Sequence, residues 1–260
     1  MNMLNLFLGR SVLSAAILLT LTATPARAEL QSGQVLVKAI SGDVTGKIGD
    51  GNWKPIKAGD QLTRGTTIRT GPNANADLIL EYNGSVLRML ADSTLEFSKL
   101  DKEQSPDGFI TETSLNLVAG SVIGSQRKLA APSRLNVKVP GGTATIVGTE
   151  YLVRADGAVT VLSGAVTLSY NLPGNKGSVK VTVQAGYSFD PSTGQVVPTS
   201  PDYLVNIIAD VDTVRLNAMS FKTTGPNRAT VVIKPEEPMS PSSAPRTPQT
   251  TGGRAPAARK

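Results

Sequence analysis

The chain has 260 residues, a formal net charge of +6, no cysteine and no histidine. Without cysteine there is no disulfide, no thiolate nucleophile and no lipid-modified cysteine. Without histidine the chain lacks the commonest metal ligand and the usual general base near neutral pH. These absences exclude Ser-His-Asp catalysis and histidine-based zinc sites.

The positive charge is concentrated at the two ends of the chain. Leaving out residues 1–28 and everything from Lys234 onward leaves 19 basic and 18 acidic residues. The central part is therefore close to neutral, and we expect no nucleic-acid partner.

Residues 1–28 have the pattern of a secretory signal peptide. Arg10 supplies the positive charge, residues 11–24 are largely apolar, and Ala26-Arg27-Ala28 is a small-x-small cleavage site. The alternative is an uncleaved anchor, but the apolar run is shorter than the roughly 20 residues that a spanning helix needs. We expect a mature protein that begins at Glu29, has no transmembrane segment, is not a lipoprotein and resides in a bacterial periplasm.

Residues 29–199 are predicted to form a single all-β domain, because short apolar or alternating runs are separated by Gly, Asn, Asp and Pro. Asn83-Gly84 predicts a type I′ hairpin turn, and Asp156-Gly157 and Ser163-Gly164 predict similar turns. The architecture is expected to be solenoid-like or jelly-roll-like. The predicted strands are residues 34–40, 67–69, 76–82, 85–90, 94–100, 114–117, 121–123, 135–139, 143–146, 150–154, 158–162, 165–169, 178–183 and 186–190.

Residues 140–153 form the most informative segment. Gly141, Gly142 and Gly148 suit positive φ or a close approach of the backbone, and the residues between them alternate as in a strand. This segment is typical of a binding scaffold and contains no catalytic residues.

Residues 200–234 are predicted to contain a docked amphipathic helix and a short closing strand at 229–234. Ser200-Pro201-Asp202 is a good helix start, and apolar residues then recur at helical spacing. That apolar stripe consists of Leu204, Ile207, Ile208, Val211 and either Val214 or Leu216. A helix that binds a partner is the alternative.

Residues 235–260 are rich in Pro, Ser, Thr and Ala and show no apolar periodicity. They predict a disordered basic tail. Its last basic residues, Arg254, Arg259 and Lys260, could make weak contacts with anionic envelope polymers.

Two motifs resemble catalytic or phosphate-binding sequences. Ser125 and Lys128 have Ser-x-x-Lys spacing, but they lie between predicted strands and no Ser-Asp-Asn element is present. Residues 42–47 resemble a phosphate loop that is one residue short, so a strand-turn-strand is the better interpretation. We therefore predict neither an enzyme nor a cofactor.

Some acidic and aromatic residues are further candidates for ligand sites. Asp43, Asp50 and Asp60 lack the regular spacing of a calcium loop, so no metal site is predicted. The pairs Asp210 with Asp212 and Glu150 with Asp156 could serve a glycosidase, although solvated surface acids are the default. Trp53, the only tryptophan, is expected to pack in the core or against a turn.

An ordered series of short motifs over residues 35–190 resembles the FecR domain. It includes Trp53-Lys54-Pro55-Ile56, Thr67-Ile68-Arg69-Thr70-Gly71, the 140–153 segment and Val161-Leu162-Ser163-Gly164. The positions that carry the resemblance, all expected to be structural, are Gly42, Trp53, Gly59, Gly71, Gly84, Gly120, Gly141, Gly148, Thr149, Gly164 and Gly186.

The resemblance implies a β-rich periplasmic unit that is used for protein contacts. The best-known members of the family regulate sigma factors and carry an anti-sigma segment and a transmembrane helix before this domain, whereas a cleavable signal stands in that place here. We therefore expect a non-enzymatic exported module that binds another envelope protein or serves as a scaffold. The alternatives are an envelope polysaccharide-binding protein or hydrolase, and an accessory component of cell-surface signalling.

Overall fold

A computed structural model describes residues 31–105, 108–129, 131–174 and 176–219. The predicted signal peptide, closing strand and tail lie outside the described residues. The elements are β1 (Gln31–Ser32), β2 (Val35–Ser41), β3 (Val44–Ile48), β4 (Lys54–Pro55), β5 (Gln61–Leu62), β6 (Thr66–Thr70), β7 (Asn75–Leu80), β8 (Ser85–Met89), β9 (Thr94–Ser105), β10 (Gly108–Ala119), β11 (Ser121–Ser125), β12 (Arg134–Val139), β13 (Gly142–Arg154), β14 (Val159–Asn171), β15 (Ser178–Gln184), β16 (Tyr187–Asp190), β17 (Gln195–Pro198) and α1 (Pro201–Met219).

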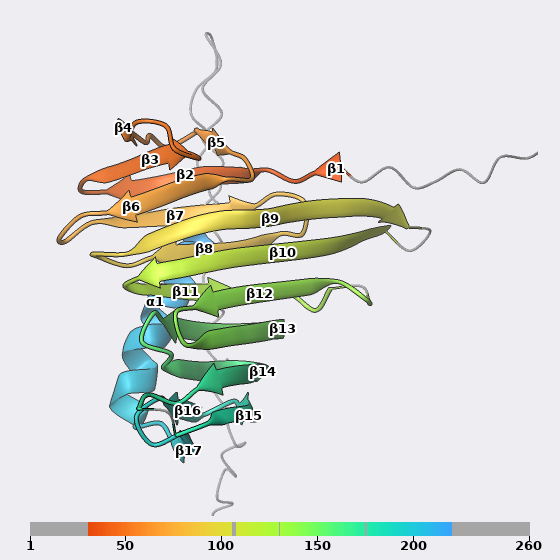
Figure 1. The fold of residues 1–260 in the computed structure, drawn as a ribbon. Coiled ribbons are helices and arrows are strands. Elements are labelled where there is room, and N and C mark those ends of the chain that lie inside the picture. The colour runs from red at the N-terminus through yellow and green to blue at the C-terminus, as the bar shows by residue number, and fades with distance from the viewer. Residues whose placement is uncertain (1–30, 106–107, 130, 175, 220–260) are drawn as a thin grey trace, which may run out of the picture.

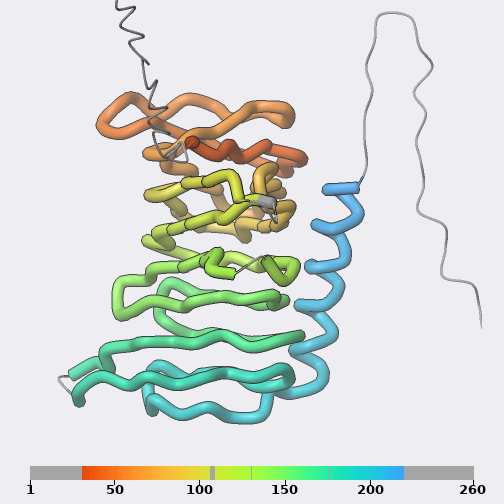
Figure 2. Tube along the Cα trace, turned by 90° about the vertical axis from the view of Figure 1, so that its right-hand side faces the viewer, coloured from red at the N-terminus to blue at the C-terminus, as the bar shows by residue number. Residues whose placement is uncertain are grey.

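The strands form a curled sheet that is stacked in chain order, from β2 and β3 at one end to β15 and β17 at the other (Figure 1). α1 runs back along one side of the stack (Figure 2). The prediction of an all-β domain with one C-terminal helix is confirmed.

The sheet folds into two facing layers. The first, here called the open layer, contains β3, β6, β9, β10, β12, the first half of β13, the second half of β14, and β15. The second, the helix layer, contains β5, β2, β7, β8, β11, the second half of β13, the first half of β14, β16 and β17.

The chain coils between the layers. β10 pairs in parallel with β12 in the open layer, and the intervening β11 lies in the helix layer. This turn of a coil supports the solenoid-like alternative over the jelly roll.

The two longest strands belong to both layers. β13 changes register between Val147 and Glu150, and its two halves pair with different neighbours. Gly148 (φ +61°) and Gly164 (φ +76°) adopt the left-handed conformation at the bends, which glycine tolerates without steric cost. The predicted breaks at 147–149 and 163–164 are therefore bulges inside continuous strands, and the expected turn at Ser163-Gly164 was wrong.

The turn between β7 and β8 also differs from the prediction. Leu80 pairs with Ser85, so the loop has four residues, 81–84. Gly84 has φ +67°, but Asn83 is not among the residues with positive φ, as a type I′ turn would require. Instead, the Asn83 side-chain oxygen accepts a hydrogen bond of 3.0 Å from the Ser85 N–H.

The core fills the space between the layers. It consists mainly of Val, Leu and Ile, with Phe97, Tyr151 and Phe189 as its largest fully buried rings. The alternation of buried and half-exposed residues along β6, β12 and β13 puts one face of each strand into this core.

Burial raises the pKa of the Tyr151 hydroxyl because the phenolate would lose its solvation. The unfolded chain then releases this proton at lower pH than the folded chain does. The contribution of Tyr151 to the free energy of unfolding should be fully present below about pH 10. Above that pH it should fall by up to about 1.4 kcal/mol per pH unit. Urea unfolding between neutral and strongly alkaline pH measures the slope, and Tyr151→Phe should make it shallower by that amount. An unchanged slope in the variant would contradict the assignment to Tyr151.

α1 begins as predicted. The Ser200 hydroxyl accepts a hydrogen bond from the Tyr203 N–H, and Asp202 lies in the first turn. Ile207, Val211 and Val214 are buried, and Ile207 and Val211 pack on Ile123 and Leu152 of the helix layer.

The predicted stripe of α1 was partly wrong. Ile208 and Leu216 lie on the exposed side of the helix. Within the described ranges, no helix is long and apolar enough to cross a membrane.

Candidate functional site

β15 is a seven-residue strand at the end of the open layer. It pairs with β14 along its whole length, and no strand pairs with its other side in the part of the chain that the structure describes. Such an edge offers a row of unpaired backbone groups to another chain.

The hydrogen-bond pattern identifies which backbone groups of β15 point outward. The Ala185 N–H donates to the Gly164 carbonyl at the end of the pair. In an antiparallel ladder such positions alternate, so Val179, Val181 and Val183 bond to β14. The N–H and C=O groups of Lys180 and Thr182 therefore face away from β14.

The side chains of β15 follow the same alternation. Val179, Val181 and Val183 point toward the core and are partly or fully buried, whereas Lys180, Thr182 and Gln184 are exposed. The edge is thus polar on its outer face and apolar on its inner face.

The outer face of the open layer continues this polar character. One row of cross-strand neighbours runs Asn116, Lys138, Thr143, Ser169 and Lys180, and a second runs Ser114, Asn136, Thr145, Thr167 and Thr182. α1 packs on the helix layer (Figure 2). A strand added to β15 would extend this polar surface.

The opposite end of the stack is built differently. β3 pairs with only two residues of β4, one of which is Pro55, and the Ile56 N–H that follows donates to the Val44 carbonyl of β3. Short strands and proline are common ways to block an edge. The free edge at β15 has neither feature.

The family-signature glycines are distributed along the whole stack. Gly42, Gly59, Gly84, Gly120, Gly148, Gly164 and Gly186 have positive φ. Gly141 has no positive φ, but a Cβ there would lie 2.4 Å from the Tyr170 ring. Gly71 bridges loops by donating its N–H to the Asp43 carbonyl.

Only three signature residues meet in space. At the bends of β13 and β14, the Thr149 hydroxyl lies 2.9 Å from the Ala165 carbonyl oxygen, and a Cβ on Gly164 would lie 2.5 Å from the Gly148 carbonyl oxygen. These residues fix the crossing between layers and offer no open site.

Trp53 is not a core residue. It is 36% exposed, and its ring lies between the guanidinium of Arg69, 4.5 Å from the ring centroid, and the ammonium of Lys47, at 5.5 Å. Cation–π attraction therefore holds the ring on the surface. Of the two alternatives, core packing was wrong, because the indole covers charged side chains of β3 and β6 instead.

The four carboxylates of the two candidate glycosidase pairs all take part in ion pairs. Asp210 pairs with Arg88, Glu150 and Asp212 with Arg215, and Asp156 with Arg154. Ser125 ends β11, and Lys128 is exposed beyond it.

Sequence reasoning found the strand at 178–183 but not its position at an edge. The alternation of polar residues with a central lysine, Ser178, Lys180, Thr182 and Gln184, is a recognised feature of edge strands and was the available signal.

Comparison with known proteins gives one family match. The model of the FecR protein family matches residues 66–167. Seven signature positions lie inside this range, and Gly42, Trp53, Gly59 and Gly186 lie outside it.

Two solved structures of a candidate anti-sigma factor from Parabacteroides distasonis ATCC 8503 are similar to this chain. Both are 13% identical to it, with TM-scores of 0.38 and 0.37. In each case the similarity covers 52% of this chain and 59% of the other, so the chain spans about three fifths of their length. No curated protein matches the chain.

Proposed function

We propose that this chain, whose residues 66–167 match the FecR family model, is a non-enzymatic binding module of the bacterial envelope that accepts an extended segment of another protein along β15. The observation that carries the proposal is the edge of β15, seven residues long and paired on one side only among the residues that the structure describes. Strand addition uses such backbone groups for affinity and alternate side chains for specificity.

The chemistry of the edge indicates the kind of segment that fits. The incoming strand would place one face over the half-buried Val179 and Val181 and the other beside Lys180 and Thr182. We therefore expect an alternating segment that is apolar on one face and polar or acidic beside Lys180.

The signal peptide predicted at residues 1–28 supports a periplasmic location for this partner. The ion pairs of the candidate acids and the scarcity of aromatic residues, 4% of the chain, favour protein binding over polysaccharide hydrolysis or binding.

A proline substitution tests the edge directly. Thr182→Pro removes an outward N–H while leaving the hydrogen bonds of Val181 and Val183 to β14, and Thr182→Val keeps the N–H as a matched control. With a photoactivatable amino acid at Gln184, the wild-type chain and Thr182→Val should form one discrete cross-linked adduct in cells. Thr182→Pro should lose at least about nine tenths of it, as expected if more than 1.4 kcal/mol of binding is lost.

Circular dichroism and thermal melting of the purified variants establish that both remain folded. An adduct that persists at full yield in the folded Thr182→Pro variant would contradict binding along β15.

An accessory role in cell-surface signalling is the second candidate, supported by the FecR match over residues 66–167. Identification of the cross-linked partner separates the two. A transporter or a sigma-factor regulator would favour signalling, and a structural envelope protein would favour a scaffold.

A further inference from the structure

A groove of about 690 Å³ lies between the C-terminal end of α1 and the outer face of the helix layer. Its sheet side is a row of cross-strand neighbours on four strands, namely Leu36 of β2, Ile79 of β7, Val86 of β8 and Ser125 of β11. Three of the four are aliphatic, so they form a continuous apolar floor, here called the aliphatic strip. The strip lies in the helix layer, and the inference below does not depend on the edge of β15.

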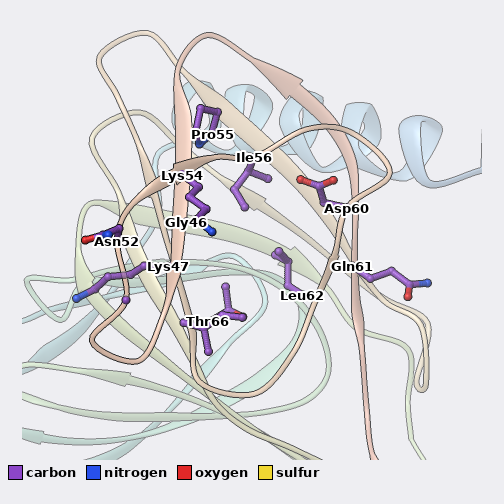
Figure 3. A pocket seen from close by; sticks show the side chains of 12 residues that line it. Gly46, Lys47, Asn52, Lys54, Pro55, Ile56, Asp60, Gln61, Leu62 and Thr66 are labelled. Carbon is purple, nitrogen blue, oxygen red and sulfur yellow. The ribbon is translucent and has the colours of Figure 1, made fainter.

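The groove differs in chemistry from the cavity at the N-terminal end of the stack. That cavity, of about 420 Å³, is lined by charges of both signs, among them Lys47, Lys54 and Asp60 (Figure 3). The floor of the groove carries no charge. It therefore suits an apolar segment of chain.

The aliphatic strip is only partly covered by α1. Asn217 of the helix donates a hydrogen bond to Asp77 of β7, so the helix covers Asp77 and lies beside Ile79, which is two residues further on the same face of the strand. Leu36 and Ile79 are half-buried, and Met219 on the helix side of the groove is 55% exposed. Apolar side chains therefore face one another across an open groove.

The chain continues from the edge of this groove, because Met219 lines it and residues 220–260 follow. Within them, Val231-Val232-Ile233 is the only run of three apolar residues. Gly225-Pro226-Asn227 is a turn signal, and Pro226 is seven positions from both Met219 and Ile233. A chain that reverses direction there brings the apolar run back to the level of Met219.

The direction of α1 fixes the direction of such a returning segment. α1 runs from the C-terminal end of the stack toward the strands made first, and its last residues lie beside β7 and β2 (Figure 2). A segment that returns along the helix therefore runs from β2 toward β11. Residues after the apolar run would reach the β11 end of the groove.

The charges at the edge of the groove are mainly positive. Lys38, Arg127 and Arg215 line it, against one acid, Glu81. Arg215 already pairs with two carboxylates of the described chain. Arg127, just beyond the end of β11, forms no ion pair with any residue that the structure describes. An acidic group is thus expected at the β11 end.

The sequence places acids at the matching position. Glu236 and Glu237 are the only acidic residues after Met219, and they follow Ile233 by three and four positions. An extended chain covers about 10–14 Å over that separation. Adjacent strands are about 4.8 Å apart, so the step from β8 past β11 is within this reach.

We propose that residues 229–237 fold back along α1 and occupy this groove. The apolar run Val231–Ile233 packs on the aliphatic strip, and the carboxylates of Glu236 and Glu237 meet the Arg127 guanidinium. Because the segment is tethered to the end of α1, its local concentration is high and a small contact area is sufficient to hold it.

Cysteine pairs test the position of the segment, because the chain has no cysteine of its own. In the full chain, Pro235→Cys is combined either with Ser125→Cys in the groove or with Asn75→Cys outside it. Asn75 and Ile79 lie on the same face of β7, at equal distances in sequence from Asp77. Under mild oxidation, the Ser125 pair should form an intramolecular disulfide at least about tenfold faster than the Asn75 pair, as measured by mass spectrometry.

Three substitutions in the Ser125 pair identify the contacts that hold the segment. Ile233→Asp puts a charge on the aliphatic strip and should slow disulfide formation to the rate of the Asn75 pair. Thr224→Asp adds the same charge to the chain before the turn and should leave the rate unchanged. Arg127→Gln should slow the reaction about threefold, as the loss of an exposed ion pair allows. Circular dichroism checks that each variant is folded.

Equal rates for the Ser125 and Asn75 pairs would overturn the proposal, since the segment would then have no fixed position. A fast reaction that survives Ile233→Asp would also contradict it, because the apolar run would not be the contact. Disulfides that join two chains would assign the groove to a second copy instead. Failure of the Thr182 cross-linking experiment would leave this inference unaffected, and the reverse also holds.

Discussion

Replacing Gly120 by alanine is expected to lower the free energy of unfolding by about 3–5 kcal/mol, through overpacking together with a left-handed backbone conformation. A Cβ at this position would lie 2.2 Å from the Ser93 hydroxyl oxygen, 2.5 Å from Ser93 Cα and 2.7 Å from the Asp92 carbonyl oxygen. Two of these three atoms belong to the backbone, so a side-chain rotation cannot relieve the clash. Gly120 also has φ +76°, which a residue with a Cβ disfavours.

The turn glycine Gly84 provides the matched control. Its φ of +67° is similar, but a Cβ there would meet no atom within 4 Å. Gly84→Ala should therefore cost only about 1–2 kcal/mol, the contribution of the backbone alone. Urea unfolding of both variants measures the difference. Equal losses of stability in the two variants would mean that Ser93 and Asp92 move away from the new Cβ at little energetic cost.

Replacing Arg88 by leucine is expected to lower the free energy of unfolding by about 3–5 kcal/mol, because it leaves a buried carboxylate without its cation. Asp77 is 1% exposed, and Arg88 contacts it through Nε at 2.7 Å and Nη2 at 2.9 Å. The remaining nitrogen, Nη1, donates to Asp210 of α1 at 3.0 Å, so one guanidinium joins β7, β8 and the helix. Hydrogen bonding to Asp77 is the main reason that the pKa of Arg88 is raised.

Two further variants isolate the burial effect. Arg154→Leu removes an exposed pair with Asp156 and should cost less than about 1 kcal/mol. The double variant Arg88→Leu with Asp77→Leu should recover much of the lost stability, because no charge then remains buried. Chemical denaturation of the set gives the coupling energy between the two residues. A double variant no more stable than Arg88→Leu would show that packing around the guanidinium, and not charge, dominates.

The sequence was sufficient to predict where strands occur but not how they join. Alternation identifies residues 143–146 and 150–154 as strands, yet Gly148 between them can mark a turn or a bulge equally well. Whether a turn or a bulge forms at Gly148 depends on neighbours such as Ala165, whose carbonyl accepts a hydrogen bond from the Thr149 hydroxyl. Those neighbours are distant in sequence, and local pattern does not report them.

Ion pairs between residues that are far apart in sequence could not be predicted, because local pattern does not report distant neighbours. Arg88 and Asp210 are 122 positions apart, and nothing near either residue indicates the other. The buried face of α1 differs from the predicted stripe for this reason. Asp210 and Asn217 on the helix hydrogen-bond to Arg88 and Asp77 of the sheet, so part of the face that packs on the sheet is polar.

Elements of the candidate sites were visible in the sequence to different degrees. The polar alternation around Lys180 could have identified an edge strand, because it is a local feature. By contrast, Thr66 and Thr70 look alike in sequence. Only the folded arrangement distinguishes the threonine whose hydroxyl has partners from the one whose hydroxyl is enclosed without any among the described residues.

The position of α1 has a consequence for the order in which the parts of the chain can fold. Ile123, Leu152 and Arg88 belong to strands made early in synthesis, but the residues that cover them, Ile207, Val211 and Asp210, come from the last described element. Until that helix emerges, the helix layer exposes apolar side chains and a guanidinium with only half of its acidic partners. The final structure is therefore reached only after nearly the whole chain is available, even though the sheet itself is stacked strand by strand from the N-terminus.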